Sequence, residues 1–428
     1  MKTVIISILV IILCIGCKQQ PDYIVIESKS DNCKVLNLDP VFEPIPWDTT
    51  TISDIVDTIK IVALETTRES ILDHIFTLKI FGDRIVIYDG NEGIAIFDIN
   101  GKYIRHIRRG QGPEEINYSL DFDADNQFLY IMQVDKISKY TLDGEFVEYY
   151  PMPEEYMMCM ENLKKVDDGF LLSKYPYSDE LSYEAFHLDE NLNEKTHFVF
   201  ENKSHYCGQS NFTMMDGRIV LYMPMCNTIY QFDGKTFSPY YILNYPKFAN
   251  TFENYSGLQG LSSSADFFQK YCTMGKFFFF GPMYQASNIL FFTFMDIMRP
   301  WNVYVDTQNG KFRVCARASE RDKPYEYLLY FGGVGCSYND YIVRYILPEY
   351  YLTEPKIPEE TLAQERAFME EQGFDWKNAK KEEKDKDWYS KIEHISAEDI
   401  NKLKTAKPED NPILVFIKFK HIPDDPKN

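Results

Sequence analysis

One sequence pattern recurs along this chain: a tight turn, a short apolar run, a second turn and another apolar run. The tight turns lie at Gly82-Asp83, Asp125-Asn126, Asp168-Gly169, Asp216-Gly217, Ser287-Asn288 and Asn339-Asp340. Each precedes a run rich in Ile, Val, Leu, Phe and Tyr, which suit a packed pleated sheet, at 84–88, 128–132, 170–172, 218–222, 289–294 and 341–345. The second residues of the turns are 43, 43, 48, 71 and 52 residues apart. A period of about 40–50 residues with four strands per unit is typical of β-propellers.

The second half of each repeat is an outer hairpin. Copies with Asn-Gly or Asp-Gly lie at 97–103, 140–146, 230–235 and 306–312. Because Asn-Gly and Asp-Gly tolerate the positive φ angles of a type I′ turn, we expect two-residue hairpins there. The remaining copy, at 186–192, lacks the Gly, which predicts a longer loop.

The two ends of the repeat region complement each other. The sixth unit has no outer hairpin before 412–420, and the apolar run at 58–64 has no unit of its own. Pairing these two segments closes a ring and leaves no long open sheet edge. We therefore predict an all-β fold over 58–420, a six-bladed β-propeller of four-stranded antiparallel blades whose last blade is closed by the N-terminal strand. An open sandwich is the alternative, although sandwich strands rarely repeat so evenly.

The first residues predict an export signal. Lys2 and the apolar run 4–15 form a segment of signal-peptide length that ends at Leu13-Cys14-Ile15-Gly16-Cys17. This sequence is similar to a bacterial lipobox, which predicts a signal peptide at 1–16 and a lipid on Cys17, with an ordinary secretion signal as the alternative. Lipid chains attach a protein to a membrane without spanning it. Residues 17–57, which contain four prolines between short apolar runs, are expected to form a tether, and residues 421–428 a C-terminal tail.

The net charge and the cysteine content limit which partners, metal sites and disulfides we expect. The formal net charge is -20, so the chain should repel the phosphate backbones of nucleic acids and anionic membrane surfaces. Without Cys14 and Cys17, seven of the nine cysteines remain, and they contain no C-x-x-C pair. A zinc site is therefore not supported, and free buried cysteines are favoured over a disulfide framework.

Two insertions interrupt the repeat. Ser263-x-x-Asp266 predicts a short helix near 264–272, and the apolar run 276–280 that follows is expected to be a core strand. The second insertion, 356–410, holds 26 charged residues among its 55. Pro358, Gly373 and the capping pattern Ser396-x-x-Asp399 predict helices within it. A solvated helical flap over the last blade is favoured, and a partner-docking arm is the alternative.

Four motifs resemble one known family: residues 61–67 (IVALETT), Phe97-Asp98-x-x-Gly101-Lys102, residues 110–115 (GQGPEE) and residues 410–415 (DNPILV). Together they are similar to the six-bladed propeller lipoproteins of Bacteroidetes, a group of NHL-like and TolB-like propellers defined largely as domains of unknown function. The resemblance implies a lipid-anchored protein of the cell envelope, in the outer membrane. It implies no catalytic residues. Lys18, Gln19 and Gln20 are not acidic, so the leaflet stays open.

Only one loop offers candidate binding residues. The loop at 110–115 should cross the face on which the channel opens, so Arg108, Arg109 and Gln111 are candidate ligand-binding residues. The alternative is that Gly and Pro simply shape a long crossing between blades.

No catalytic or metal motif emerges from the sequence. The seven histidines form no H-E-x-x-H spacing, no G-x-S-x-G turn occurs, and residues 121–125 (DFDAD) lack the Gly and distal Glu of a calcium loop. We interpret 121–125 as a hairpin strand, and we expect neither a metal nor a cofactor. The favoured function is a non-enzymatic binding or scaffold module for a protein partner or a glycan. The alternative is a polysaccharide or peptidoglycan hydrolase or lyase in the channel, which would require two carboxylates or a His–carboxylate pair there.

Overall fold

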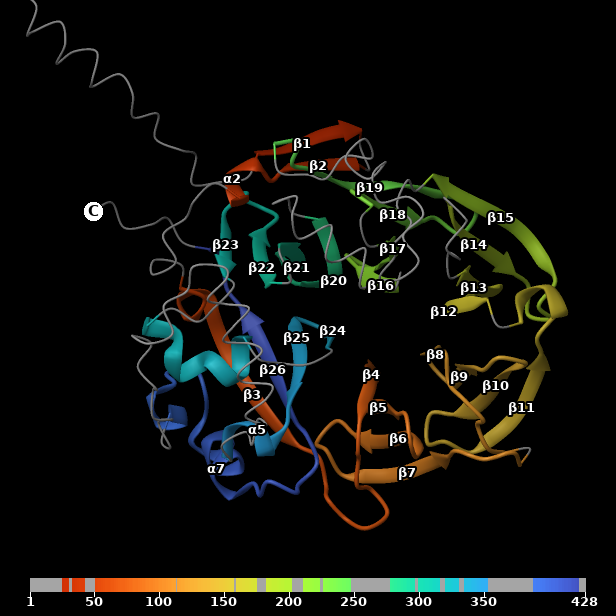
Figure 1. The fold of residues 1–428 in the computed structure, drawn as a ribbon, viewed down its shortest axis with the longest axis horizontal. Helices are drawn as coiled ribbons and strands as arrows, with labels where there is room; N and C mark the ends of the chain where they lie inside the picture. Colours follow the sequence, from red (N-terminus) through yellow and green to blue (C-terminus); the bar gives the residue numbers. More distant parts are fainter. Residues whose placement is uncertain are drawn as a thin grey trace, which may run out of the picture.

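Six sheets stand side by side around a central axis as the blades of a β-propeller (Figure 1). The computed structural model describes residues 25–30, 33–42, 51–112, 114–157, 159–174, 182–201, 211–223, 226–247, 278–296, 299–315, 320–330, 335–352 and 388–422. Each blade contains four antiparallel strands, which are consecutive in the chain in every blade except the last. The predicted all-β, six-bladed fold is confirmed.

The first three blades follow the predicted order from the innermost strand outward. Blade 1 contains β4 (Ile75–Phe81), β5 (Arg84–Asp89), β6 (Gly93–Asp98) and β7 (Tyr103–Arg108). Blade 2 contains β8 (Asp121–Ala124), β9 (Phe128–Met132), β10 (Lys136–Thr141) and β11 (Phe146–Pro151). Blade 3 contains β12 (Met160–Val166), β13 (Gly169–Lys174), β14 (Ser182–Leu188) and β15 (Glu194–Glu201), and the short 3-10 helix η2 (Glu154–Tyr156) precedes it.

The last three blades carry the additions to the ring. Blade 4 contains β16 (Asn211–Met215), β17 (Arg218–Tyr222), β18 (Thr228–Phe232) and β19 (Phe237–Asn244). Blade 5 contains β20 (Phe278–Ala286), β21 (Ile289–Asp296), β22 (Arg299–Asp306) and β23 (Phe312–Cys315). Blade 6 contains β24 (Cys336–Tyr338), β25 (Tyr341–Ile346), β26 (Ile413–Phe419) and β3 (Val56–Ala63).

The hydrophobic core is divided among the blade interfaces. Six clusters of buried side chains lie between neighbouring blades, and each draws on both of them. Most blades are therefore packed on both faces. This explains why middle strands such as β5 and β17 are continuous apolar runs rather than alternating ones.

Blade 6 is closed by the predicted N-terminal strand. β26 pairs antiparallel with β3 from Ile413↔Ala63 to Phe419↔Val56. Next to this pair, the buried Asn411 side chain accepts a hydrogen bond from the Leu72 N–H at 2.8 Å and donates to the Glu65 and Ser70 carbonyls, both at 2.8 Å. Two of the four family motifs therefore meet at the closure of the ring.

The outer hairpin of blade 1 differs from the predicted two-residue type I′ turn. In blade 1, the Gly101 N–H donates to the Asp98 carbonyl at 2.9 Å, and the Asp98 N–H donates to the Lys102 carbonyl at 2.8 Å. Gly101 has φ +89°, whereas Asn100 is not among the described residues with positive φ. The strand register shifts next to the turn. This is the four-residue turn with a Gly bulge, in which only the Gly needs the left-handed region, so the prediction is wrong for blade 1. Blade 4 has the predicted two-residue loop, closed by the Asp233 N–H, which donates to the Thr236 carbonyl at 3.2 Å.

The blade 3 hairpin keeps the same turn without a glycine. The Leu192 N–H donates to the Asp189 carbonyl at 3.0 Å, and the Asp189 N–H donates to the Asn193 carbonyl at 2.9 Å, which repeats the pattern of blade 1. Leu192 takes the Gly position with φ +62°. The predicted longer loop is therefore wrong, because a buried Leu192 side chain, 2% exposed, holds the strained backbone in place.

Part of the segment expected to be a tether belongs to the fold. β1 (Val25–Ser30) and β2 (Cys33–Asn37) form a hairpin, and β2 extends blade 4 by pairing in parallel with β19. The one-turn helix α2 (Asp39–Phe42) follows, and its Phe42 ring lies 4.9 Å from that of Phe294 in blade 5. Leu36 and Leu38 are fully buried, so hydrophobic packing overrides the proline-rich composition of 17–57. Residues 1–24, with the predicted signal peptide and Cys17, lie outside the described residues.

The second insertion is helical where the structure describes it. It contains the 3-10 helix η6 (Trp388–Lys391) and α7 (Ala397–Thr405). Ser396 caps α7 by accepting a hydrogen bond from the Asp399 N–H at 3.0 Å, as the sequence predicts. The helices predicted at 264–272 and 358–373 lie outside the described residues. The described residues include no helix with the length and hydropathy needed to cross a membrane.

The remaining segments pack against blades 5 and 6. The short helices η1 (Ser53–Ile55), η4 (Glu320–Tyr325), η5 (Glu326–Tyr330) and α5 (Pro348–Leu352) surround the ring closure. The first residues of the predicted C-terminal tail are also anchored: Ile422 is 1% exposed, and its N–H donates to the Asp306 carboxylate at 3.2 Å. The ordered ring therefore extends to residue 422, beyond the predicted boundary at 420.

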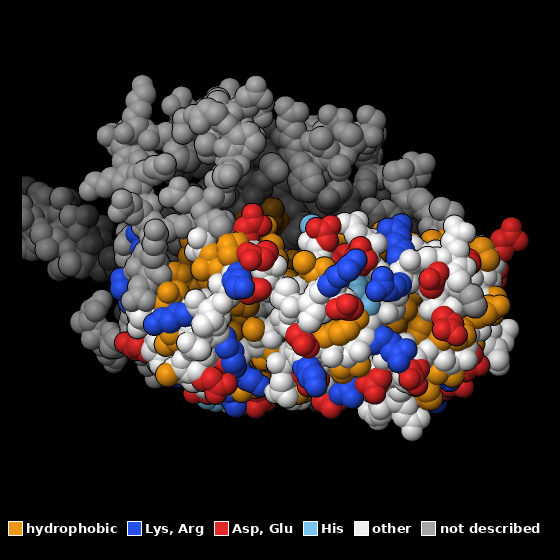
Figure 2. All heavy atoms as spheres, turned by 90° about the horizontal axis from the view of Figure 1, so that it is seen from below, with side chains coloured by type: hydrophobic (Ala, Val, Ile, Leu, Met, Phe, Trp, Pro, Cys, Tyr) orange, Lys and Arg blue, Asp and Glu red, His pale blue; other side chains and the backbone are white. Residues whose placement is uncertain are grey.

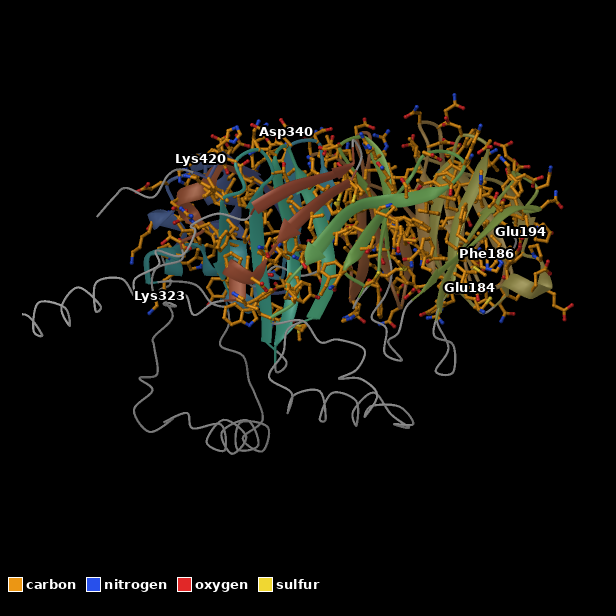
Figure 3. All side chains as sticks on the ribbon, turned by 90° about the horizontal axis from the view of Figure 1, so that it is seen from above. Glu184, Phe186, Glu194, Lys323, Asp340 and Lys420 are labelled. Carbon is orange, nitrogen blue, oxygen red and sulfur yellow. The ribbon has the colours of Figure 1, made fainter. Side chains whose placement is uncertain are left out.

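The two faces of the ring are not equivalent. Asp340, in the turn after β24, and Lys420, after β26, lie on one face, whereas Lys323 of η4 and Glu184 of β14 lie on the other (Figure 3). The helix η4, which lies between blade 5 and blade 6 in the chain, is thus on the face of Lys323. On the side shown in Figure 2, acidic and basic side chains alternate over the described surface and neither sign gathers into a patch.

Candidate functional site

The central channel is the candidate site. The innermost strands β4, β8, β12, β16, β20 and β24 contact one another in turn around the axis. They surround a cavity of about 840 Å³, to which all six contribute. A volume of this size is within the range of small-molecule sites. Because no single segment of sequence forms this wall, no local motif reveals it.

The cavity extends from the axis into blade 5. The register of β20 shifts between Phe279 and Met283, and Gly281 and Pro282 at this irregularity line the cavity. A bulge bends its strand and disrupts the ladder, and such bulges often lie next to sites. Side chains of the second and third strands of blade 5, including Thr293 and Asn302, reach the cavity as well. The hollow is therefore wider at blade 5 than at the other blades.

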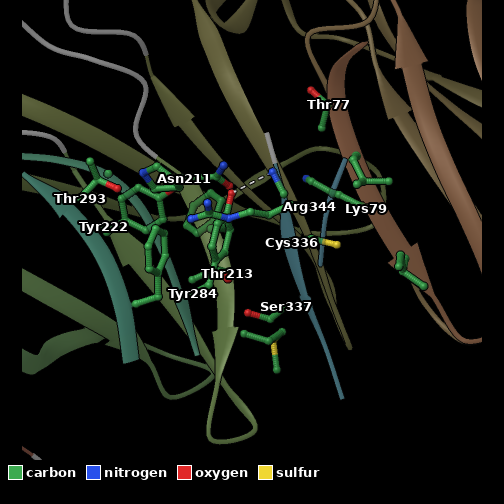
Figure 4. A pocket seen from close by; sticks show the side chains of 18 of the residues that line it. Thr77, Lys79, Asn211, Thr213, Tyr222, Tyr284, Thr293, Cys336, Ser337 and Arg344 are labelled. Carbon is green, nitrogen blue, oxygen red and sulfur yellow. Dashed lines mark hydrogen bonds between the residues drawn. The ribbon is translucent and has the colours of Figure 1, made fainter. Parts of the chain in front are cut away.

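Neutral polar and aromatic groups make up much of the wall. Figure 4 shows hydroxyl and amide side chains facing one hollow together with two tyrosines: Thr77, Asn211, Thr213, Tyr222, Tyr284, Thr293 and Ser337. Burial raises the pKa of both Tyr222 and Tyr284, so their phenols stay neutral at physiological pH. A wall of this kind offers hydrogen bonds and ring faces without acid–base chemistry.

Aromatic side chains continue from the cavity to its rim. Phe76 lines the cavity and is 53% exposed. Its ring lies 4.7 Å from that of His74 and 5.8 Å from that of Tyr88, and Tyr88 lies 6.3 Å from the 48%-exposed Tyr118. Large exposed rings beside a hollow present an apolar surface that a ligand can cover.

The acidic side chain of the lining is engaged in structure. Asp123 accepts hydrogen bonds from the Lys164 ammonium at 2.9 Å and from the Lys165 N–H at 2.7 Å. Its neighbour Asp121 accepts from the Lys79 ammonium at 2.7 Å and from the Leu163 N–H at 3.0 Å. These contacts join the inner strands of blades 1, 2 and 3. They confirm that 121–125 is a hairpin strand, and the described residues contain no His, Cys, Asp and Glu cluster suited to a metal ion.

Arg344 differs from the two lysines of the lining. It belongs to β25 and is 6% exposed, and its guanidinium lies 4.7 Å from the Phe291 ring centroid. One nitrogen donates to the Leu329 carbonyl at 2.9 Å. Within the part of the chain that the structure describes, no carboxylate forms an ion pair with this guanidinium. The cavity therefore contains one buried cation without a carboxylate partner.

The candidate residues from the sequence lie elsewhere. Arg109 donates to the Asn117 carbonyl and the Gly90 carbonyl, both at 2.9 Å, which ties the crossing from blade 1 to blade 2. Arg108 ends the outermost strand β7, and Gln111 is exposed in the loop. None of these three residues lines the cavity.

The loop that carries them is held by its own contacts. The Glu115 carboxylate accepts from the Gly112 N–H at 2.8 Å, and a Cβ on Gly110 would lie 2.0 Å from that carboxylate. These contacts favour the alternative stated above, in which the glycines shape the crossing.

The free thiols carry no visible reactivity. The free cysteines Cys33, Cys226 and Cys336 belong to the described part of the chain. Cys336 lines the cavity, where burial raises the pKa of its thiol to about 12. A thiol with that pKa is neutral and weakly nucleophilic at physiological pH. Cys207 and Cys272 lie outside the described residues.

Comparison with known proteins identifies a family and a shared fold. A family model described as a domain of unknown function (DUF4934) matches residues 40–418. A solved structure of a putative exported protein from Bacteroides fragilis is similar at a TM-score of 0.64 and 16% identity, covering 87% of this chain and 98% of that one.

Other solved structures are more distant. A member of the DUF4221 family from Bacteroides vulgatus matches at a TM-score of 0.46 and 11% identity, covering 86% of this chain and 97% of that one. The extracellular domain of a putative one-component system from B. thetaiotaomicron matches at a TM-score of 0.32 and 10% identity, covering 60% and 29%. No curated protein matches this chain.

Proposed function

The chain belongs to the DUF4934 family of domains of unknown function, and from that premise we propose that it is a non-enzymatic binding module that holds a saccharide in its central channel. The observation that carries this proposal is the wall of the cavity, where hydroxyl, amide and aromatic side chains from blades 1, 4, 5 and 6 surround one hollow (Figure 4). Saccharides need this combination, because they present hydroxyl groups at their edges and C–H faces that pack on aromatic rings.

The rim favours a saccharide over a flat protein partner. Phe76 and Tyr118 expose about half of their surface beside the opening, and His74 lies against Phe76. A chain of several sugar units can occupy the cavity and cover these rings at the same time. A folded partner cannot enter a closed ring of strands.

The acidic groups favour binding over hydrolysis. Glycoside hydrolysis needs two carboxylates placed on either side of the bond that breaks. Among the described residues that line the cavity, Asp123 is the acidic one, and Lys164 and the backbone of Lys165 already occupy its oxygens. A carboxylate with these contacts stabilises the packing of neighbouring blades rather than acting as a general acid or base.

The cell envelope is the proposed location. The N-terminal sequence favours a lipid on Cys17 that attaches the protein to a membrane, in the outer membrane, and the similarity to a putative exported protein accords with export. Metabolic labelling with a palmitate analogue tests this anchor. The native protein should take up the label and a Cys17→Ser variant should not; equal labelling of both proteins would refute the assignment.

A ligand screen tests the proposed function. Residues 22–428, which retain every residue that the structure describes, are melted with panels of saccharides, peptidoglycan fragments and peptides. A ligand at a hundred times its dissociation constant should add about 2.7 kcal/mol to the free energy of unfolding. We expect a saccharide to stabilise the protein and to remain uncleaved. Turnover of that saccharide would support the hydrolase or lyase, and stabilisation by peptides alone would support a protein partner.

A further inference from the structure

We propose that the saccharide carries a carboxylate group and that Arg344 receives it inside the channel. This inference rests on the proposed function and names the chemical class of its ligand. The shared chemistry is a carboxylate on a sugar scaffold, and two sources supply it: uronic acids in polysaccharides, and the lactyl or peptide carboxylates of peptidoglycan fragments.

The positive charge of Arg344 is buried without a compensating negative charge among the described residues. Moving a guanidinium from water into a protein costs several kcal/mol unless hydrogen bonds and an opposite charge compensate for it. Arg344 is 6% exposed, and among the described residues it has a single hydrogen bond, to the Leu329 carbonyl, and a contact with the Phe291 ring. A guanidinium has five N–H donors, so most of its capacity is left for another acceptor.

Arg344 differs from the two lysines of the cavity wall in its ion pairing. Lys79 and Lys164 line the same cavity, but each has a carboxylate partner, Asp121 and Asp123 respectively. Their charges are therefore balanced within the wall. Arg344 is the cation of the described lining whose charge an anionic ligand would balance.

The cavity also differs in charge from the rest of the chain. The formal charge of the protein is -20, whereas the three cations of the described lining face two carboxylates, Asp123 and the adjacent Asp121, which leaves the charge of Arg344 in excess. A positive hollow inside an acidic protein attracts anions to one place, and the outer surface repels them. This distribution favours a specific anion site over general adsorption.

The shape of the group favours a carboxylate. A guanidinium presents parallel N–H groups that match the two oxygens of a carboxylate, and such paired hydrogen bonds are among the strongest in proteins. In Figure 4, Arg344 lies within the same hollow as Asn211, Thr213, Tyr222 and Tyr284. A sugar whose carboxylate binds Arg344 would thus place its hydroxyl groups among these side chains.

Matched pairs of ligands test the proposal. The full-length protein in neutral detergent is titrated calorimetrically with trigalacturonate and its methyl ester, and with muramyl dipeptide and its amide. Each pair differs in its carboxylate alone. The proteins are the wild type, Arg344→Gln, Arg344→Lys and the control Arg105→Gln. Arg105 is 48% exposed on β7, pairs with Glu145 and does not line the cavity.

The proposal predicts a loss that is specific for the acid. The wild type and Arg105→Gln should bind the acid of one pair at least about tenfold more tightly than its neutral partner. Arg344→Gln should weaken binding of the acid by about 10–100-fold, the range for hydrogen bonds to charged groups, and leave the neutral partner unchanged. The pair that responds identifies the source of the carboxylate.

Other results would overturn the proposal. Equal binding of acid and neutral partners by the wild type, or an unchanged preference in Arg344→Gln, would assign Arg344 a purely structural role. If Arg344→Gln does not fold, Arg344→Lys provides the test. The lysine keeps the positive charge but lacks the planar guanidinium that forms paired hydrogen bonds, so binding of the acid alone should weaken about fivefold or more. Failure of every saccharide to bind the wild type would refute the proposed function itself, whereas binding of the neutral partners alone would refute the carboxylate and keep the saccharide.

Discussion

At the scale of single residues, the family motifs serve the architecture of the ring. Asn411 binds the backbone of residues 65–72, and Gly101 lies against the Ala63 carbonyl, where a Cβ would come within 2.2 Å. The Glu115 carboxylate closes the loop at Gly112. The contacts of Asn411 and Gly101 connect segments that are distant in sequence, whereas Glu115 closes a local loop. The motifs that identify the family therefore describe how the propeller closes and not what it binds.

Replacing Asn411 by alanine should loosen the closure of the ring. Asn411→Ala leaves the Leu72 N–H and the Ser70 carbonyl without their partner and removes one of the hydrogen bonds to the Glu65 carbonyl, at a side chain that is 2% exposed. We expect a loss of about 2–4 kcal/mol in the free energy of unfolding, measured by chemical denaturation. Asn401→Ala, on the exposed face of α7, is the matched control and should change stability by less than about 0.5 kcal/mol. Similar losses of stability in both variants would contradict a specific role of Asn411 in closing the ring.

Two glycines in outer hairpins separate backbone strain from close approach. Gly101 ends the turn of blade 1 and Gly234 begins the loop of blade 4, with similar φ of +89° and +95°, but a Cβ on Gly234 meets nothing within 4 Å. Gly234→Ala should therefore cost only the strain of a left-handed residue, about 1 kcal/mol. Gly101→Ala should cost at least about 2 kcal/mol more, because the Ala63 carbonyl must move. Equal melting temperatures of the two variants would show that the contact with strand β3 does not matter.

At the scale of elements, the N-terminal hairpin is the largest departure from the prediction. β2 covers the outer edge of blade 4, and the segment after it fills the gap between blades 4 and 5 with Leu38, Val41 and Phe42. An exposed outer strand invites pairing with other chains, and this hairpin covers the edge of β19. The segment thus has a structural role in addition to any role as a spacer.

Truncation of a buried leucine tests that role. Leu36→Ala removes a fully buried side chain of β2, and we expect a cost of about 2–4 kcal/mol in thermal or chemical unfolding. Leu352→Ala, at a position that is 39% exposed, is the control and should change stability by less than about 0.5 kcal/mol. If Leu36→Ala were as stable as the wild type, residues 25–42 would act as a tether after all.

The sequence predicts local structure better than distant pairings. The turns and apolar runs locate the second strand of each of the six blades, and the capping pattern at Ser396 locates α7, because those signals depend on neighbouring residues. The parallel pairing of β2 with β19 joins residues about two hundred positions apart, and no local signal reports it. The Leu192 turn was missed for a similar reason, since tertiary burial compensates for its backbone strain.

At the scale of the whole molecule, the candidate site is a product of the ring. Its wall takes side chains from strands of all six blades that are spread over more than 250 residues, from Phe76 to Arg344. The loop at 110–115 stands out in the sequence because its glycines are concentrated there, whereas Arg344 and Thr213 look like ordinary strand residues. Turn chemistry is visible in a sequence, and convergence on an axis is not.

The central claim is that ligands bind in the channel, and a variant that fills the channel tests it most directly. Thr213 lies on β16 and lines the cavity, so Thr213→Trp would occupy the hollow. Val147, which is 41% exposed on the outermost strand β11, provides the control Val147→Trp. The saccharide panel is melted with the wild type and both variants in parallel. We predict that the same ligands stabilise the wild type and Val147→Trp and fail to stabilise Thr213→Trp. Equal stabilisation of all three proteins, or of none, would contradict a binding site in the channel.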